Sequence, residues 1–225
     1  LIKKKNWKAL VTAGPTREYI DPVRYISNES SGKQGYEIAI ALNKLGIKTT
    51  LISGPSNIAS PRGLKVKKIT SADEMFNEVK KSLPVDLAVC AAAVTDFKPA
   101  EKSKNKIKKE GIDLKTISFV KNNDILQFIS TNNKHRPRLV VGFSAETENL
   151  TKNSINKIKR KHCDLIFAND VSKKGIGFNS DYNKVSVIDK KGNIKILPKN
   201  KKSFIAKKIA EILLDKLLID DRNIN

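Results

Sequence analysis

The chain has 225 residues and a formal net charge of +21 at pH 7, a length that suits one α/β domain with a core of ordinary size and does not require a second domain. Only 7 of its 44 basic residues are Arg, and Arg makes most bidentate contacts to bases and phosphates, so the charge favours a solvated Lys-rich surface over a specific nucleic-acid partner. No apolar run approaches the roughly 20 residues that cross a membrane, and we expect no membrane partner.

The few cysteines and histidines argue against a disulfide-rich protein and against a zinc-binding protein. Cys90 and Cys163 lie far apart, each within an apolar run, and the only histidines are His135 and His162. Lone buried thiols are typical of a reduced cytoplasmic protein rather than a disulfide framework, and the set is too small for a zinc cluster. We therefore expect a cytoplasmic location and no metal held by protein side chains.

Apolar periodicity along the chain alternates between strand and helix. Strands are expected at 9–13, 49–53, 86–93, 139–143 and 165–168, and helices at 35–45, 71–83, 124–131, 146–161 and 202–218. Ser71 followed by Glu74 is a capping box at the start of one helix. This alternation predicts an α/β, Rossmann-like three-layer fold with a mostly parallel central sheet, as a single domain over 1–225.

Two segments depart from this alternation. The Lys-rich stretch at about 98–115 contains Pro99 and Gly111 and is expected to be an exposed, mobile loop. The runs 185–188 and 194–197, joined by DKKGN, predict a small β-hairpin extension of the fold. We find neither an internal repeat nor a domain linker apart from the charged stretch.

In an open α/β sheet, ligands bind at the carboxyl ends of the strands, so the loops there are the candidate sites. The first, 14–35, carries Gly14, Gly32 and Gly35 ahead of a helix. Glycines allow close approach of backbone to an anion at a helix start, but an ordinary tight turn fits equally well. The spacing matches neither the dinucleotide-binding GxGxxG nor the phosphate-binding loop with GK[ST].

The next two loops carry carboxylates. Asp96 follows three alanines in AAAVTDFKPA and can accept hydrogen bonds from sugar hydroxyls, although tight packing and helix capping explain the segment without a ligand. Glu146 and Glu148, in VGFSAETEN, suggest acid–base work or a divalent cation. The same pair would also complement the dipole of a helix that began at 146.

Three lysines and one further loop complete the candidates. Lys157 and Lys161 share one helix face and could clamp a polyphosphate, and Lys106 in the charged stretch could close on the reacting phosphorus. A solvated basic face explains the same spacing. The loop 168–185, dense in Asn, Gly and Asp, could bind a ligand or simply form turns. We find no activated nucleophile, so catalysis would depend on positioning and charge.

Taken together, these segments resemble the phosphopantothenate–cysteine ligase family of coenzyme A biosynthesis, usually the C-terminal half of a bifunctional bacterial protein with a flavin-dependent decarboxylase. The matching motifs are TAGPTREYIDPVRYISNESSGKQGYEIA, AAAVTDFKPA with KIKK, VGFSAETEN, and CDLIFANDVS followed by GFNSDYNKV. They occur in family order from Thr12 to Val185 and cover most of the chain.

The resemblance implies a two-step ligation in a homodimer. The carboxylate of 4′-phosphopantothenate attacks the α-phosphorus of CTP, giving an acyl-cytidylate and pyrophosphate, and the amine of L-cysteine then displaces CMP. Mg²⁺ would be held chiefly by nucleotide phosphates. The stand-alone eukaryotic members can use ATP, and this chain resembles the bacterial type, which prefers CTP.

The resemblance also assigns roles to residues. Asn28 would contact the acyl carbonyl with help from the backbone at Ala92 and Ala93, Arg24 would bind the phosphate of phosphopantothenate across the dimer interface, and Lys106 would stabilise charge at the α-phosphorus. The positions expected around the nucleotide are Gly14, Ala92, Asp96, Asn123, Asp124, Ile125, Leu126, Phe143, Lys157 and Lys161.

This sequence departs from the family in two respects. NNDIL stands where the family commonly has Asn-Pro, which weakens the assignment of Asn123. The decarboxylase half is not in this chain, so we expect its activity to end at the cysteine amide.

Two other classes of function compete with the ligase: a nicotinamide- or flavin-binding oxidoreductase and a nucleic-acid-binding module. This chain lacks the GxGxxG motif that the oxidoreductase would need. A nucleic-acid-binding module would bind its ligand tightly and with a strong dependence on salt.

Overall fold

A computed structural model describes residues 6–108, 116–170 and 180–222, and these residues form one eight-stranded main sheet. Its strand order is β12-β11-β10-β9-β6-β1-β4-β5. The strands are β1 Lys8–Ala13, β4 Lys48–Ser53, β5 Lys65–Lys68, β6 Leu87–Cys90, β9 Leu139–Glu146, β10 Leu165–Asp170, β11 Tyr182–Asp189 and β12 Ile194–Lys201. The pairs from β10 across to β5 are parallel, whereas β11 and β12 pair antiparallel.

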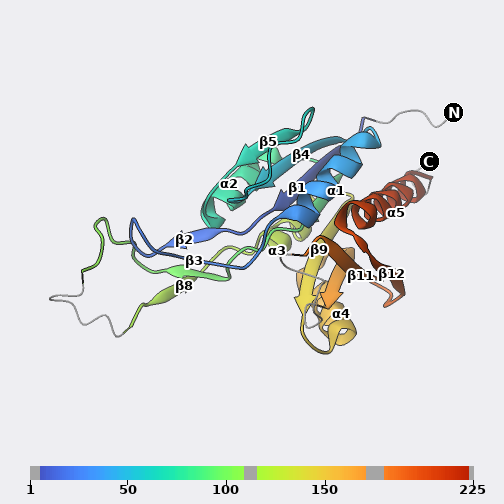
Figure 1. The fold of residues 1–225 in the computed structure, drawn as a ribbon. Helices are drawn as coiled ribbons and strands as arrows, with labels where there is room; N and C mark the ends of the chain where they lie inside the picture. The colour runs from blue at the N-terminus through green and yellow to red at the C-terminus, as the bar shows by residue number, and fades with distance from the viewer. Residues whose placement is uncertain (1–5, 109–115, 171–179, 223–225) are drawn as a thin grey trace.

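Helices cover both faces of this sheet (Figure 1). One face packs against α1 Lys33–Lys44 and α5 Lys202–Arg222, through a core that includes Val11, Leu42 and Phe167. The other packs against α2 Ala72–Ser82, α3 Ile125–Ser130 and α4 Leu150–Lys161, through a core that includes Leu10 and Ile166. Adjacent residues of β1 and β10 thus point to opposite cores, as the two-residue strand repeat requires. The expected three-layer fold with a mostly parallel sheet and a terminal hairpin is confirmed.

Strand order reverses between β1 and β6. From β1 the chain continues outward to β4 and β5, and from β6 it continues the other way to β9 and β10. The carboxyl ends of β1 and β6, at this reversal, are the place where open α/β sheets bind ligands.

Four short strands outside the main sheet were not expected. β2 Arg17–Tyr19 pairs antiparallel with β3 Tyr25–Ser27, and β7 Phe97–Pro99 pairs antiparallel with β8 Phe119–Lys121. Figure 1 shows β2, β3 and β8 projecting together to one side of the main sheet. We call these two hairpins, with their connecting residues 17–27 and 97–121, the arm; residues 109–115 lie outside the described residues. The expectation of a loop from 98 is therefore wrong at Lys98 and Pro99, which belong to β7.

The strand–helix boundary near 146 also differs from expectation. β9 continues to Glu146 because Ser144, Ala145 and Glu146 keep pairing with β10. α4 begins only at Leu150, after Asn149 in a left-handed conformation, and has no acidic residue in its first turn. Glu146 and Glu148 therefore do not open a helix, and dipole complementation does not explain them.

The expected cap of α2 is confirmed. Ser71 Oγ accepts a hydrogen bond from the Glu74 backbone N–H at 3.2 Å. Glu74 Oε2 in turn accepts from the backbone N–H of Thr70 at 2.7 Å. None of the described helices is long and apolar enough to cross a membrane.

Candidate functional site

The loops after β1 and β6 run side by side at the strand-order reversal and are joined by backbone hydrogen bonds. The Ala93 N–H donates to the Gly14 carbonyl at 2.9 Å, and the Ala92 N–H donates to Thr12 Oγ1 at 3.3 Å. Gly54 follows β4, and a Cβ on it would lie 1.7 Å from the Pro15 carbonyl oxygen, so glycine is needed where the loops after β4 and β1 touch. Gly14 thus acts in backbone packing, and it lines neither of the two cavities described below.

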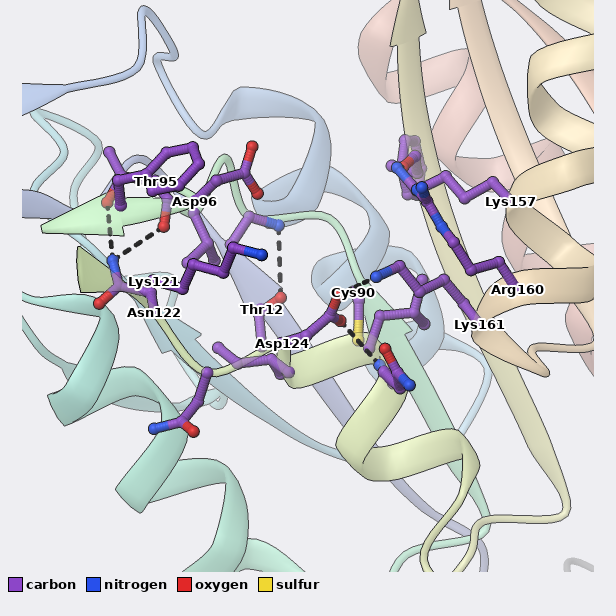
Figure 2. Close-up of a pocket in the computed structure, with 18 residues that line it drawn as sticks. Thr12, Cys90, Thr95, Asp96, Lys121, Asn122, Asp124, Lys157, Arg160 and Lys161 are labelled. Atoms are coloured by element: carbon purple, nitrogen blue, oxygen red, sulfur yellow. Dashed lines mark hydrogen bonds and ion pairs between the residues drawn. The ribbon is translucent and has the colours of Figure 1, made fainter. Parts of the chain in front are cut away.

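A cavity of about 650 Å³ opens beside the loop after β6, on the face covered by α3 and α4. Figure 2 shows its lining, with Lys157, Arg160 and Lys161 entering from α4 and Thr95, Asp96 and Asn122 on the opposite side. The structure brings together here nine of the ten positions expected around the nucleotide: Ala92, Asp96, Asn123, Asp124, Ile125, Leu126, Phe143, Lys157 and Lys161. We call this the first chamber.

The basic wall of the first chamber is held by specific acceptors. Lys157 Nζ donates to the Phe143 carbonyl at 2.7 Å, and Lys161 forms an ion pair with Asp124. Burial lowers the pKa of Lys157, and the negative charge of Glu146 opposes that shift. Arg160 is a third cation of this wall that sequence reasoning missed, although its spacing from Lys157 places both on one helix face.

The floor of the chamber depends on close packing between α3 and the sheet. Asp124 caps α3 by accepting from the Gln127 backbone N–H at 2.9 Å. A Cβ on Gly142 would lie 2.7 Å from Leu126 Cδ2 and 2.8 Å from Ile166 Cδ1. Glycine at this position therefore lets Leu126 lie directly over β9.

A second cavity of about 520 Å³, which we call the second chamber, lies on the α1 face of the sheet and shares Ala92, Val94, Asp96, Phe143 and Lys157 with the first. Its other lining includes residues 28–35, which lead into α1, together with Ala91, Ala93, Ser144, Ala145, Asn169, Asn183 and Lys202. The two chambers thus meet across the carboxyl edge of the sheet.

Asn28 and Ala93, expected to work together, are in contact. Asn28 Nδ2 donates to the Ala93 carbonyl at 3.2 Å and to the Val94 carbonyl at 3.1 Å. Both amide hydrogens are therefore committed to the loop after β6, and Asn28 can donate to a substrate oxygen only by releasing one of them. In this geometry Asn28 holds the loop whose backbone borders both chambers.

A buried polar network supports the same loop and was missed from the sequence. Thr95 Oγ1 donates to Glu18 Oε1 at 3.1 Å, and the Thr95 N–H donates to Thr16 Oγ1 at 3.1 Å. Glu18, only 4% exposed, also accepts from the Ala72 N–H at 2.9 Å. Asn122 Nδ2 donates to the Thr95 carbonyl at 2.9 Å. The network ties β2 of the arm, and Asn122 directly after β8, to the wall of the first chamber.

Arg24 and Lys106 lie apart from both chambers. Arg24 donates through Nη2 to the Ile107 carbonyl at 2.9 Å and pairs with Asp21, whose pKa the guanidinium holds well below its usual range. Lys106 is exposed next to Ile107. The structure therefore brings Arg24 and Lys106 to one place on the arm, but not to the chambers of the same chain.

Cys90 and Glu146 are the thiol and the carboxylate near the site whose reactivity the described residues define. Cys90 lines the first chamber, and burial raises its pKa to about 12, so it stays a thiol at neutral pH. Both cysteines are free, as expected. Glu146 is occupied by hydrogen bonds from Ser144 and Asn153. Among the described residues, no group of three or more His, Cys, Asp or Glu side chains could hold a metal ion.

Comparison with known families finds one that matches nearly the whole chain. Residues 4–217 match the family described as the DNA/pantothenate metabolism flavoprotein C-terminal domain. The chain belongs to this family. The resemblance seen in the sequence motifs is therefore confirmed across nearly the whole length.

The chain spans about half the length of the curated relatives that it matches. The coenzyme A biosynthesis bifunctional protein CoaBC of Borreliella burgdorferi is 44% identical over 211 residues, which cover 93% of this chain and 53% of that protein. The protein of the same name from Escherichia coli K12 is 41% identical over 224 residues, covering 97% of this chain and 54% of that protein.

Solved structures are also similar to this chain over nearly its whole length. The crystal structure of the C-terminal domain of CoaBC matches with a TM-score of 0.76 at 32% identity, covering 94% of this chain and 97% of that domain. A Cab2 variant in complex with phosphopantothenate-cysteine matches with a TM-score of 0.76 at 14% identity, covering 97% of this chain and 90% of that one, a likeness of fold.

Proposed function

We propose that this domain joins 4′-phosphopantothenate to L-cysteine through an acyl-cytidylate in coenzyme A biosynthesis, converting CTP to CMP and pyrophosphate. The observation that carries the proposal is the pair of chambers that meet at the strand-order reversal, one with a basic wall and the other bordered by Asn28 and Ala93. A nucleotide in one chamber and an acyl group in the other would react where the chambers join.

In the proposed first step, a carboxylate oxygen of phosphopantothenate forms a bond to the α-phosphorus of CTP, and the bond from this phosphorus to the β-phosphate oxygen breaks to release pyrophosphate. The nucleophile belongs to the substrate, which agrees with the unreactive state of Cys90. Lys157, Arg160 and Lys161 supply positive charge where the polyphosphate would lie, and such preorganised charge is the usual source of catalysis in phosphoryl transfer.

In the proposed second step, the amine of cysteine attacks the acyl carbon and CMP leaves. The loop of Ala92, Ala93 and Val94 borders both chambers, and Asn28 fixes it through two hydrogen bonds. A loop held in this way would position the acyl carbon for attack by the amine, and such positioning lowers the barrier of a bimolecular step.

Mg²⁺ is proposed as the cation that accompanies CTP. Mg²⁺ usually takes one or two carboxylates together with substrate phosphates and water, so the lack of a three-residue cage among the described residues fits a phosphate-held ion. Asp96 borders both chambers and is the carboxylate placed to hold its hydration shell or the sugar hydroxyls. When bound, the ion would neutralise charge on the leaving pyrophosphate.

A homodimer is proposed because Arg24 and Lys106 lie together on the arm and line neither chamber of their own chain. A partner arm would bring Arg24 to the phosphate of phosphopantothenate and Lys106 to the α-phosphorus. The printed names of the relatives describe bifunctional proteins, and we propose the same fusion or association with a decarboxylase, in the cytoplasm.

Pyrophosphate release tests the proposal. The protein is mixed with CTP, Mg²⁺ and phosphopantothenate, with and without L-cysteine. We expect a single turnover of pyrophosphate without cysteine and continuous release with it. A folded protein that releases no pyrophosphate at saturating substrate would overturn the proposal.

A further inference from the structure

The turn between β2 and β3 contains a buried carboxylate that the proposed reaction has not used. Asp21 is 0% exposed, whereas the side chain of Arg24 beside it is 49% exposed. Asp21 Oδ1 accepts from the backbone N–H groups of Val23 and Arg24 at 2.9 and 2.8 Å, which closes the turn. An aspartate in a turn commonly does only this. The second oxygen, Oδ2, is not needed for the turn.

Asp21 Oδ2 joins Arg24 to the segment that carries Lys106. It accepts from Arg24 Nε at 2.9 Å and also from Arg24 Nη2. The same oxygen accepts from the Ile107 N–H at 3.2 Å, and Arg24 Nη2 donates to the Ile107 carbonyl at 2.9 Å. Both backbone polar groups of Ile107 are therefore held by the Asp21–Arg24 pair, directly beside Lys106.

The Lys106 segment is also anchored on its other side. The Ser103 N–H donates to the Ile20 carbonyl at 2.9 Å, and Ser103 Oγ donates to the Asn105 carbonyl at 2.6 Å. Lys106 lies between the anchors at Ser103 and Ile107, and it is exposed. The backbone of Lys106 is thus fixed against the β2–β3 turn, while its side chain points to solvent.

The same contacts leave one edge of the Arg24 guanidinium open. A guanidinium has five N–H donors. The Nε–H and one N–H of Nη2 are directed to Asp21, and the second N–H of Nη2 is directed to the Ile107 carbonyl. Nη1 makes no hydrogen bond within the described ranges of the chain. Its two N–H groups are therefore available to an anion such as a phosphate.

We propose that Asp21 is a positioning residue that holds Arg24 and Lys106 as one unit, so that both reach the partner's chambers at a defined spacing. This inference rests on the proposed ligase function and on the proposed partner arm. Phosphopantothenate carries its phosphate at one end and its reacting carboxylate at the other. The residues that act at the two ends, Arg24 and Lys106, must therefore be spaced to match the length of this substrate.

The charges of the unit support a lasting contact. The Arg24 guanidinium holds the pKa of Asp21 well below its usual range, although burial opposes this shift. The backbone N–H groups of Val23, Arg24 and Ile107 act in the same direction as the guanidinium. Asp21 is therefore charged at neutral pH. An arginine held in this way before the substrate binds loses less side-chain entropy when it contacts the phosphate.

A nearly isosteric substitution separates this role from turn formation. Asp21→Asn keeps one acceptor oxygen but replaces the other with an N–H₂ group, and Arg24 loses its ionic partner in either orientation of the amide. Asp73→Asn, which breaks the ion pair between α2 and Lys98 of β7, is the matched control. Arg24→Lys removes the fork that Asp21 holds, and it is made alone and together with Asp21→Asn.

Four quantities are measured for each protein. The KM values for phosphopantothenate and for L-cysteine and the rate of the pyrophosphate burst without cysteine report on the reaction. Sedimentation velocity and the thermal midpoint report on assembly and folding. Comparison of the two KM values distinguishes a local effect on one substrate from a general loss of structure.

We expect Asp21→Asn to raise the KM for phosphopantothenate about 10- to 100-fold, the usual worth of a charge-assisted hydrogen bond. The burst should slow roughly 100-fold, because misplacing a catalytic group by about 1 Å has a cost of this order. The KM for L-cysteine should not change, and Asp73→Asn should behave as the wild type. The effects of Asp21→Asn and Arg24→Lys should not add, because Asp21 acts through Arg24.

Three results would overturn the role of Asp21. A normal burst rate in Asp21→Asn would show that Lys106 does not depend on this residue. An equal rise in the KM for L-cysteine, or dissociation to monomers, would show a general structural role. Additive effects in the double variant would show that Asp21 and Arg24 act independently. Wild-type protein that releases no pyrophosphate would instead overturn the ligase function itself.

Discussion

Substitution of Asn28 tests whether this residue acts in the second half-reaction and not in the first. Its Nδ2 bridges the carbonyls of Ala93 and Val94 at 3.2 and 3.1 Å. Asn28→Asp replaces this donor with a carboxylate oxygen that faces the same two carbonyls and repels them. Two exposed hydrogen bonds contribute about 1–2 kcal/mol to the free energy of unfolding, so we expect the variant to fold with stability lowered by about this amount.

The effect on catalysis should be larger and confined to one step. Loss of a group that positions or stabilises an acyl oxygen typically slows the reaction roughly 100- to 1,000-fold. We expect Asn28→Asp to release one equivalent of pyrophosphate at nearly the normal rate and then to accumulate the acyl-cytidylate, detected by mass spectrometry after quenching. Asn57→Asp, at an exposed position outside both chambers, is the control. Normal turnover by Asn28→Asp, or no intermediate, would refute this reasoning.

Two further predictions concern charge. Lys106→Ala should fold normally because Lys106 is exposed, yet lose formation of the intermediate; a normal pyrophosphate burst would contradict its proposed role. The hydrogen bond from Lys67, and to a smaller degree the one from Lys81, lowers the pKa of Glu78 from 4.5 to about 2. These ion pairs therefore stabilise the folded protein above pH 4.5, and this stabilisation is lost as the pH falls towards 2. Glu78→Gln should therefore lower the thermal midpoint at pH 7, and the difference should shrink on acidification; a pH-independent difference would argue against the ion pairs.

The main sheet and most of its helices could be predicted from the sequence because apolar runs, helical periodicity and capping residues mark them. β1 and β6 are nearly continuous apolar runs, and α2 has both a capping serine and a capping glutamate. The residues expected around the nucleotide also come together, since parallel strands present their carboxyl ends at one edge. Only Gly14 lies outside, because its neighbourhood is filled by the backbone of Gly54.

The arm could not be predicted from periodicity, because each of its strands is only three residues long, too short to show an alternation of apolar and polar residues. Glu18 is buried in β2 by hydrogen bonds rather than by apolar contacts. A turn signal was nevertheless present: Asp21-Pro22 lies between segments that contain Tyr19 and Tyr25, and these two residues pair across the hairpin. β5 was missed for a similar reason, since Lys65–Lys68 contains three lysines and one apolar residue.

The second chamber was only partly foreseen. Asn28 and Ala93 were expected there from the family motifs, but Lys202 carried no local signal within a Lys-rich helix start. Its position depends on β11 and β12, which return α5 to the side of α1. Such contacts between residues far apart in sequence follow from topology and not from local pattern.

The most direct test of the central claim is to identify the products formed from each nucleotide. The protein is incubated with phosphopantothenate, L-cysteine and Mg²⁺ together with CTP, ATP, UTP or GTP, and the mixtures are analysed by mass spectrometry. We predict equimolar CMP, pyrophosphate and phosphopantothenoylcysteine with CTP, formed faster than with the other three nucleotides. Absence of the cysteine amide with all four nucleotides would contradict the ligase function, and faster turnover of ATP would contradict the cytidylate intermediate.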